Sequence, residues 1–355
     1  MPVRLRSDLV NLPQYKAGRR PQPGPDGRMV KLSSNENPFP PLPSVVAAIA
    51  AAAADVREYP DPAAVRLTTS ISHHIGVAPE RIAVGTGAVS LVTYLALAAA
   101  GPGDEIVYPW RSFEAYPIVA ALAGATARPI PLSEAGRHDI AAMRAAVTDR
   151  TRLLFLCSPN NPTGPALTRE EVRTLLAGVP EDLLVVLDEA YAEYVRDPFA
   201  VNGIRDFADR DNVIVLRSFS KAYGLAGLRV GYAVGPADVI ALLRSVALPF
   251  GVTDIAAAAV AASLENADEL ASRVTAVVTE RERIVDELSQ LGFDLPATEA
   301  NFYWLPLGGD TGAFTAECES LGITVRPFAD EGVRITVGMP DDNDRVVDIA
   351  RHFAP

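Results

Sequence analysis

Residues 213–224 read Val-Ile-Val-Leu-Arg-Ser-Phe-Ser-Lys-Ala-Tyr-Gly. The apolar start of this stretch is typical of a buried β-strand, and the polar end places hydroxyls and an amine directly after that strand. Similar short apolar runs recur between residues 80 and 235, and helix-like segments separate most of them. Because the runs are continuously apolar rather than alternating, they predict an α/β fold with a mainly parallel sheet covered on both faces.

The pattern also predicts where the elements lie. The expected strands of the sheet are Ile82–Val84, Glu105–Tyr108, Thr126–Ile130, Leu153–Cys157, Leu183–Leu187, Val213–Leu216 and Val230–Val234. The expected helices between them include Val89–Ala100, Phe113–Ala123 and Arg169–Ala177. A long helical stretch follows from about Thr253 to Leu291, with a break near Asn266 or none.

We expect three parts along the chain. Residues 1–30 are rich in Pro, Gly and Arg and form an irregular N-terminal arm that packs near the substrate site. Residues 31–250 form a large domain around the sheet, and residues 251–355 form a smaller C-terminal α/β domain attached through the long helix. The last part contains strand patterns at Asn301–Leu305, Ile323–Val325 and Val333–Val337.

Composition narrows the class of protein. With 355 residues, 49% hydrophobic and 21% charged, the chain is typical of a soluble globular protein. Its net charge of −12 argues against a nucleic-acid partner. The Ala-rich stretch at 47–54 is too short to span a bilayer, and two cysteines form neither a disulfide framework nor a zinc motif. We therefore expect a cytoplasmic enzyme with no membrane partner and no metal.

Lysine is rare in this sequence and one lysine has an unusual setting. Lys16 and Lys31 lie in a polar N-terminal stretch, whereas Lys221 follows a buried strand among hydroxyls and aromatics. Unlike arginine, a lysine that is desolvated loses its proton readily and can form a Schiff base. Lys221 is therefore a candidate catalytic amine.

Polar clusters follow four of the expected strands. These clusters are Gly85-Thr86-Gly87-Ala88, Ser158-Pro159-Asn160-Asn161-Pro162-Thr163-Gly164, Asp188-Glu189-Ala190-Tyr191 and Ser218-Phe219-Ser220-Lys221. In open parallel sheets, ligands bind outside the carboxyl ends of the strands. Each cluster alone has a structural alternative: a turn glycine, a turn asparagine, or an aspartate that caps a strand or pairs with a cation.

Together the clusters match the chemical needs of pyridoxal 5'-phosphate. Lys221 supplies the amine that bonds to the cofactor, and the Gly-Thr-Gly turn supplies backbone amides for a phosphate. Asp188 keeps the ring nitrogen protonated, so that the ring accepts electrons. Asn161 and Tyr191 donate hydrogen bonds to the ring oxygen and tune the pKa of the anchoring amine.

The order of these motifs resembles fold-type-I aminotransferases. Asn160-Asn161-Pro162-Thr163-Gly164, then Asp188-Glu189-Ala190-Tyr191, then the segment from Ser218 to Tyr232 are similar to the histidinol-phosphate aminotransferase branch of this family. That branch includes aromatic amino acid aminotransferases of actinobacterial type. The resemblance extends over almost the whole chain and implies a pyridoxal-phosphate-dependent transferase fold of type I.

The resemblance implies a site for the cofactor phosphate. Ser218, Ser220 and Arg229 correspond to phosphate ligands of the family, and the backbone amides of Ala88 and Val89 complete the site. Many relatives carry acidic residues at the positions of Val89 and the residue after it. Because these contacts to a phosphate come from backbone amides, the different side chains at these positions leave them in place.

Further roles follow from the same resemblance. Lys221 corresponds to the Schiff-base lysine, which also moves a proton, in a ping-pong reaction. Phe113 corresponds to the aromatic residue that stacks on the cofactor ring. Tyr59 corresponds to a tyrosine that reaches the cofactor phosphate of the neighbouring subunit, which implies a homodimer with shared active sites.

The substrate residues are also implied by the resemblance. Arg334 corresponds to the arginine that binds the substrate α-carboxylate through two hydrogen bonds. Asn35 lies in the segment that lines that pocket, and Tyr15 in the N-terminal arm either covers the substrate side chain or packs on the surface. Separately from the resemblance, Arg326 either contacts substrate or forms a surface or dimer salt bridge.

The expected reaction moves an amino group between an aromatic L-amino acid and a 2-oxo acid such as 2-oxoglutarate. The segment from Trp110 to Ile118 and the residues after the glycine turn favour an aromatic substrate, with histidinol phosphate as the alternative. A threonine-phosphate decarboxylase is a remoter alternative. A non-catalytic ligand-sensing regulator is disfavoured because the acidic chain has no basic recognition segment.

Overall fold

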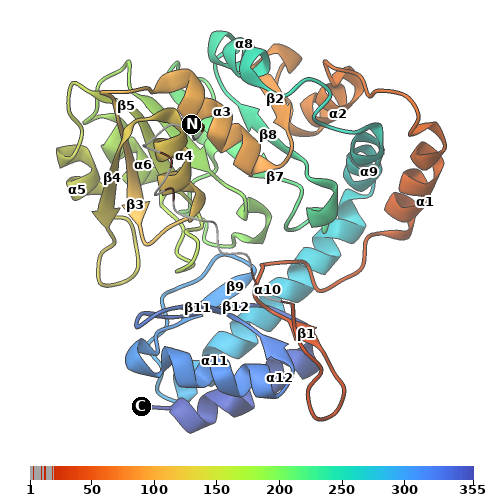
Figure 1. Cartoon of the computed structure of the whole chain (residues 1–355), viewed down its shortest axis with the longest axis vertical. Coiled ribbons are helices and arrows are strands. Elements are labelled where there is room, and N and C mark those ends of the chain that lie inside the picture. The colour runs from red at the N-terminus through yellow and green to blue at the C-terminus, as the bar shows by residue number, and fades with distance from the viewer. Residues whose placement is uncertain (1–2, 4–8, 10–11, 13–17, 19) are drawn as a thin grey trace.

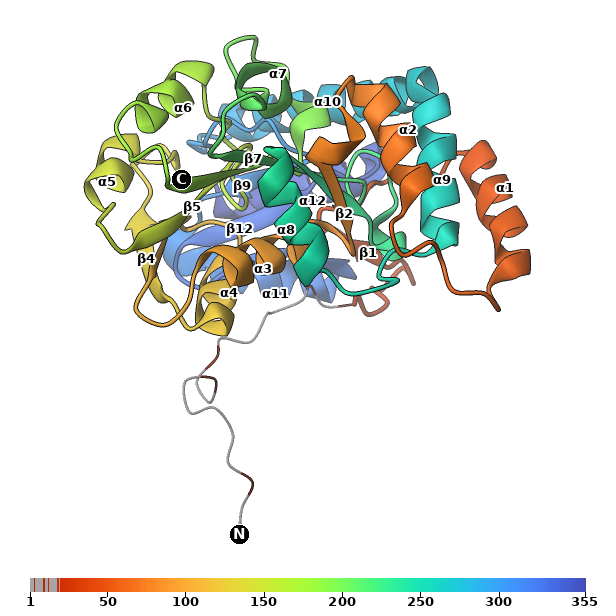
Figure 2. The same cartoon turned by 90° about the horizontal axis from the view of Figure 1, so that it is seen from above.

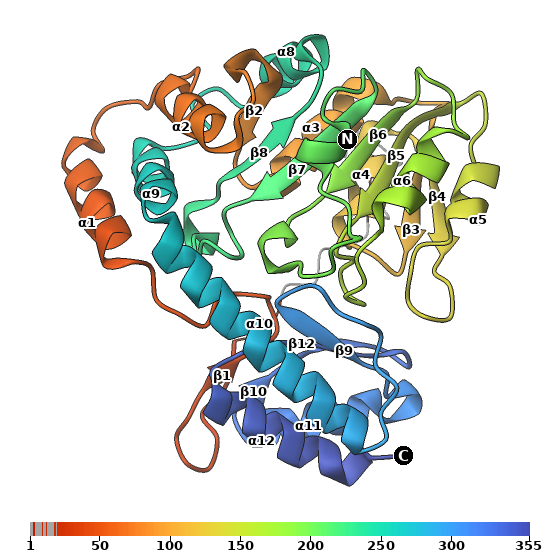
Figure 3. The same cartoon turned by 180° about the vertical axis from the view of Figure 1, so that it is seen from behind.

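The computed structural model describes residues 3, 9, 12, 18 and 20–355. A large part built around one sheet and a smaller part lie side by side, and the helix α10 (Ala267–Gln290) runs between them (Figures 1 and 3). In the described part of the chain, no helix has the length and apolar character needed to cross a membrane.

The described residues contain a seven-stranded sheet with the order β2-β8-β7-β6-β5-β3-β4. Its strands are β2 (Ile82–Gly85), β3 (Glu105–Trp110), β4 (Thr126–Pro131), β5 (Thr151–Cys157), β6 (Leu184–Asp188), β7 (Val213–Ser218) and β8 (Gly231–Val234). Strand β8 runs antiparallel to both of its neighbours, and the other neighbouring pairs are parallel. The expected strands and the mainly parallel sheet are therefore confirmed.

Helices cover both faces of this sheet. One face packs against α3 (Ala88–Ala99), α4 (Ala115–Ala123) and α8 (Ala237–Val246), and the other against α5 (Ile140–Ala145), α6 (Arg169–Leu176) and α7 (Gly203–Phe207) (Figure 2). Successive strand residues serve opposite faces: Val186 and Ile214 pack on the first, Val185 and Val215 on the second. This double burial explains why the strands are apolar throughout.

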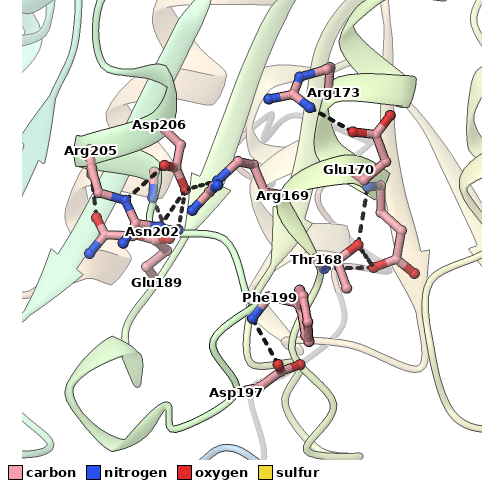
Figure 4. Close-up of polar contacts among 12 residues, drawn as sticks. Thr168, Arg169, Glu170, Arg173, Glu189, Asp197, Phe199, Asn202, Arg205 and Asp206 are labelled. Atoms are coloured by element: carbon pink, nitrogen blue, oxygen red, sulfur yellow. Dashed lines mark hydrogen bonds and ion pairs between the residues drawn. The ribbon is translucent and has the colours of Figure 1, made fainter.

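Helix α6 begins at the residue that the sequence predicts. The Thr168 hydroxyl accepts a hydrogen bond from the backbone of Glu171, whose carboxylate accepts one from the Thr168 backbone (Figure 4). This reciprocal capping satisfies two amide groups that the first turn of a helix leaves unpaired. In the same region, Asp206 forms ion pairs with Arg169 and Arg205 (Figure 4).

A third cluster of apolar residues packs beside β2 and β8. It joins these strands to α1 (Pro43–Ala52), α2 (Val65–Ile75) and α9 (Asp254–Glu265). Helix α9 ends at Asn266, where the backbone leaves helical geometry and the side-chain amide donates to Ala262. Because such a side chain competes with the helix for backbone hydrogen bonds, the long helical stretch is broken there.

The smaller part is built on a three-stranded antiparallel sheet with the order β11-β12-β9. Its elements are β9 (Phe302–Leu305), α11 (Thr311–Ser320), β11 (Arg326–Phe328), β12 (Gly332–Thr336) and α12 (Pro340–Ala350). Strand β1 (Val30–Lys31) pairs in parallel with β10 (Ile323–Thr324), so this early segment of the chain lies against the smaller part. The chain then crosses to the large part through residues 33–38.

Candidate active site

One cavity lies at the carboxyl edge of the large sheet, where residues of β11 and β12 also reach it. Thirteen of the predicted site residues line this cavity: Asn35, Ala88, Val89, Phe113, Asn161, Asp188, Tyr191, Ser218, Ser220, Lys221, Arg229, Arg326 and Arg334. Tyr59 lies outside it, is 83% exposed and packs on Phe250 with ring centroids 4.9 Å apart. Tyr15 lies outside the described residues.

Lys221 follows β7 and brings an amine into the cavity. Its Nζ donates to the backbone oxygen of Ser34 at 3.3 Å and lies 5.5 Å from the ring centroid of Tyr191. Burial, with the positive charges of Arg334 and Arg229, lowers the pKa of this amine from 10.5 to about 7. A large share of the amine is therefore uncharged and nucleophilic near neutral pH.

Asp188 ends β6 and is buried against the cavity. Its oxygens accept hydrogen bonds from the Tyr116 hydroxyl at 3.1 Å and the Ala190 backbone amide at 3.2 Å. Burial raises the pKa of this carboxyl from 3.8 to about 6. Among the described residues, no ion pair joins Asp188 to a cationic side chain, so the carboxylate suits a cationic group of a ligand.

A phosphate-sized anion has a matching site at the start of α3. Gly87 precedes this helix with a φ of 77°, and no side chain caps the first amides of the helix. A Cβ at Gly87 would clash with the guanidinium of Arg229, so glycine allows this close approach. Arg229 Nη1 also donates to the Ser220 hydroxyl at 3.2 Å. Helix amides, a hydroxyl and a guanidinium together suit a phosphate group.

Arg334 and Asn35 connect the two parts of the molecule across the cavity. Arg334, from β12, donates to the side-chain oxygen of Asn161 at 2.6 Å and to the Ser33 backbone oxygen at 2.7 Å. Asn35 donates from its side-chain amide to the Tyr191 hydroxyl at 2.9 Å. Burial raises the pKa of that hydroxyl, so Tyr191 stays protonated and can donate to a ligand.

Sequence reasoning missed two contacts of the site. Tyr116 lies one helical turn after Phe113 and packs edge-on against its ring, so the spacing of these aromatics was a usable signal. Glu114 lines the cavity and forms an ion pair with Arg326 at 2.6 Å. The salt bridge of Arg326 is therefore formed within the chain at the cavity, and contact of Arg326 with substrate stays a prediction.

Comparison with known proteins yields one family. The family model described as aminotransferase class I and II matches residues 27–349. An aromatic amino acid aminotransferase from Thermobifida fusca (strain YX) is 54% identical, over 99% of this chain and 98% of its own length. One from Streptomyces avermitilis is 49% identical, over 99% of this chain and 97% of its own.

Among solved structures, the fold is similar to that of histidinol-phosphate aminotransferase from Sinorhizobium meliloti, crystallised in complex with pyridoxal-5'-phosphate. The TM-score is 0.85 at 29% identity, and the match covers 92% of this chain and 90% of the other. The predicted fold class and the resemblance stated above are confirmed.

Proposed function

Because the chain belongs to the aminotransferase class I and II family, we propose that it transfers an amino group from an aromatic L-amino acid to a 2-oxo acid such as 2-oxoglutarate, with pyridoxal 5'-phosphate as cofactor. The observation that carries the chemistry is the cavity in which the Lys221 amine and the buried Asp188 carboxylate both lie. The names of the relatives at about 50% identity support the aromatic substrate.

The residues present fit this cofactor. Ser218, Ser220, Arg229 and the first amides of α3 would hold its phosphate, and Asp188 would face its ring nitrogen. When bound, pyridoxal phosphate supplies an aldehyde carbon that bonds to amines and a ring that accepts the electrons released at the substrate α-carbon. Among the described residues, Asp188 receives hydrogen bonds from neutral donors and forms no ion pair with a cation. The protonated ring nitrogen would supply that cationic partner.

The chain's own residues then perform the proton and binding steps. Lys221, with a pKa of about 7, would hold the cofactor through its amine and could take a proton from the substrate α-carbon and return it. Arg334 orients the α-carboxylate that amino acids and 2-oxo acids share, through a planar pair of donors. Asn161 and Tyr191 would donate hydrogen bonds to the ring oxygen, and Phe113 would lie against the ring.

We also propose a homodimer in which Tyr59 serves the neighbouring subunit's site. Two features support this assembly: Tyr59 lies outside its own cavity, and it is exposed together with Phe250, Leu248 and Val56. Tyr59 and Phe250 pack on each other, and exposed apolar patches are typical of interfaces. The cytoplasmic location and the division at residues 30 and 250 stay predictions.

A pair of charge-conserving variants tests the role of Lys221. Lys221→Arg should abolish transamination and the near-ultraviolet absorbance that borohydride bleaches, because a guanidinium cannot act as the amine. Lys31→Arg is the matched control: Lys31 forms a surface ion pair with Glu36 at 2.7 Å, and its variant should keep both signals. Retention of absorbance and activity in Lys221→Arg would sink the proposal.

Substrate choice needs a separate experiment. We expect kcat/KM for phenylalanine to exceed that for histidinol phosphate, with 2-oxoglutarate as the acceptor. The fold similarity to a histidinol-phosphate aminotransferase makes that ester the competing substrate. A clear preference for histidinol phosphate would replace the aromatic assignment and leave the cofactor chemistry intact.

A further inference from the structure

Two loops of the large part meet behind the cavity and share one buried asparagine. The loop after β3 contains Ser112 and Phe113, and the loop after β5 contains Asn160 and Asn161. Ser112, Phe113 and Asn161 line the cavity, whereas Asn160 lies behind them and is 1% exposed. In each loop, a buried polar residue therefore directly precedes a residue that we propose to contact the cofactor ring.

The side chain of Asn160 joins these two loops. Its amide nitrogen donates to the backbone oxygen of Arg111 at 3.1 Å and to the hydroxyl of Thr163 at 2.8 Å. Its side-chain oxygen accepts from the Ser112 hydroxyl at 2.6 Å. The backbone oxygen of Asn160 accepts from the Gly164 amide at 2.7 Å, which closes its own loop. A buried amide with its donors and acceptor all used holds both loops in one arrangement.

His138 provides a second donor to the same oxygen of Asn160. Its Nε2 lies 3.3 Å from that oxygen, and because the oxygen only accepts, Nε2 carries the proton. Burial lowers the pKa of the imidazole from 6.5 to about 4, so His138 is neutral near pH 7. Among the residues that the structure describes, Nδ1 of His138 has no hydrogen-bond partner. The imidazole is thus buried with a single side-chain hydrogen bond, the one to Asn160.

The neighbouring Asn161 has a fixed orientation. Arg334 Nη1 donates to the Asn161 side-chain oxygen at 2.6 Å, which leaves the amide nitrogen for the cofactor ring oxygen. A donor there stabilises the negative charge of the ring oxygen and so lowers the pKa of the nitrogen that joins Lys221 to the cofactor. Hydrogen bonds weaken steeply with distance and angle, so this effect depends on where the loop holds Asn161.

We propose that Asn160 and His138 are positioning residues, which hold the loop of Asn161 against the loop of Phe113 so that the Asn161 amide meets the cofactor ring oxygen. The inference rests on the proposed function, since it concerns the same cofactor. Neither Asn160 nor His138 lines the cavity, so both act on the cofactor through Asn161.

The test measures the pH at which the absorbance of bound pyridoxal phosphate changes, and it needs no substrate. Asn161→Ala sets the largest expected effect: the midpoint should rise by about one pH unit, because a hydrogen bond to a charged group is lost. His138→Phe keeps a planar ring but removes the donor, and should raise the midpoint by about half a pH unit. His138→Gln restores a donor and should return the midpoint to within about 0.2 pH units of the wild type.

A double variant shows whether His138 acts through Asn161. His138→Phe should shift the midpoint no further in a chain that already carries Asn161→Ala, because effects that pass through one contact are not additive.

Asn343→Ala is the matched control for Asn160→Ala. Asn343 is fully buried, donates to the Gly338 backbone oxygen at 3.0 Å and does not line the cavity. Both variants should lower the urea concentration at which the protein unfolds, since both remove buried hydrogen bonds. Only Asn160→Ala should raise the absorbance midpoint. If Asn160→Ala does not fold, the His138 variants decide the question.

Three results would overturn the inference. They are an unchanged midpoint in His138→Phe, an additive shift in the double variant, and an equal shift in Asn343→Ala. A wild type that binds no pyridoxal phosphate would instead refute the proposed function, and the inference with it. An unchanged midpoint in Asn161→Ala would refute the role proposed for Asn161, through which Asn160 and His138 act.

Discussion

Asp188 and Glu189 are adjacent acids at the end of β6, but their bonding partners differ. Glu189 is buried, forms an ion pair with Arg217 at 2.8 Å and accepts a hydrogen bond from the first amide of α7 at 2.7 Å (Figure 4 shows its place beside Asn202). Asp188 is equally buried but receives a hydroxyl and a backbone amide. The charge of a buried acid that pairs with a cation of its own chain is already satisfied within the fold, whereas an acid held by neutral donors can serve a cationic ligand.

The largest effect that we expect from this comparison is on stability. Glu189→Gln leaves the buried Arg217 with only the more distant carboxylate of Glu193 and should lower the free energy of unfolding by about 3–5 kcal/mol. Urea unfolding measures this loss. Glu193→Gln is the control, because Glu193 lies 3.8 Å from the same guanidinium and should cost less. If the Glu193 variant costs as much, the Glu189 pair has no special structural role.

Replacing Asp188 should have the opposite effect on the free energy of unfolding of the cofactor-free protein: the variant should be more stable, not less. Its pKa is about 6 in the folded chain and 3.8 as the ordinary value, so the unfolded state releases its proton first. The stability from the protonated carboxyl is complete below pH 3.8 and is lost as the pH rises through 6.

Asp188→Asn should therefore be more stable than the wild type at pH 8, by about 3 kcal/mol at most, from 1.36 kcal/mol for each pKa unit. At pH 5 the difference should fall to roughly half. Thermal or urea unfolding at the two pH values measures it. A difference that does not change with pH would contradict a raised pKa for Asp188.

The same substitution should impair catalysis. Without the carboxylate, a proton at the cofactor ring nitrogen loses its partner, and kcat should fall about 100-fold. Steady-state kinetics with phenylalanine and saturating cofactor measure this loss. Glu189→Gln, where it remains folded, should change kcat by no more than a few-fold, and equal losses in the two variants would remove the contrast between the carboxylates.

The smallest effect concerns the neutral donor to Asp188. Tyr116→Phe removes one hydrogen bond to the carboxylate, which is worth about 1 kcal/mol, and should lower kcat about five-fold. Tyr94→Phe is the matched control, because it removes a hydroxyl that bonds to the Leu248 backbone away from the cavity. If both variants are fully active, the Tyr116 hydroxyl does not support Asp188.

Much of the fold follows from local sequence patterns, and the failures have physical causes. Strands buried on both faces are apolar throughout, so their positions were predictable, but Gly231–Val234 carries no sign of its reversed direction. Helix α1 was not expected, and the bounds of α2 were not predicted. Leu42 precedes α1 without a side-chain cap, and α2 begins after Ala64, which has a left-handed φ of 47° in place of a capping side chain.

The site was predictable where function depends on strand ends. Asp188 ends one apolar strand and Lys221 comes three residues after the end of the next, so the sequence alone places them at one edge of the sheet. The ion pair between Glu114 and Arg326 was not predictable, because it joins residues 212 positions apart and depends on how the smaller part packs.

The reversed direction of β8 restricts how this chain can change in length. Ser218 and Gly231 are partners across β7 and β8, so the whole connection between these strands lies at the cavity edge. That one connection carries both Lys221 and Arg229. An inserted residue there would displace an amine and a guanidinium at once, whereas the connection between α6 and β6 lies at the opposite edge and can tolerate insertions. Relatives of this chain should therefore differ in the length of the α6–β6 connection before they differ in the length of the segment 219–230.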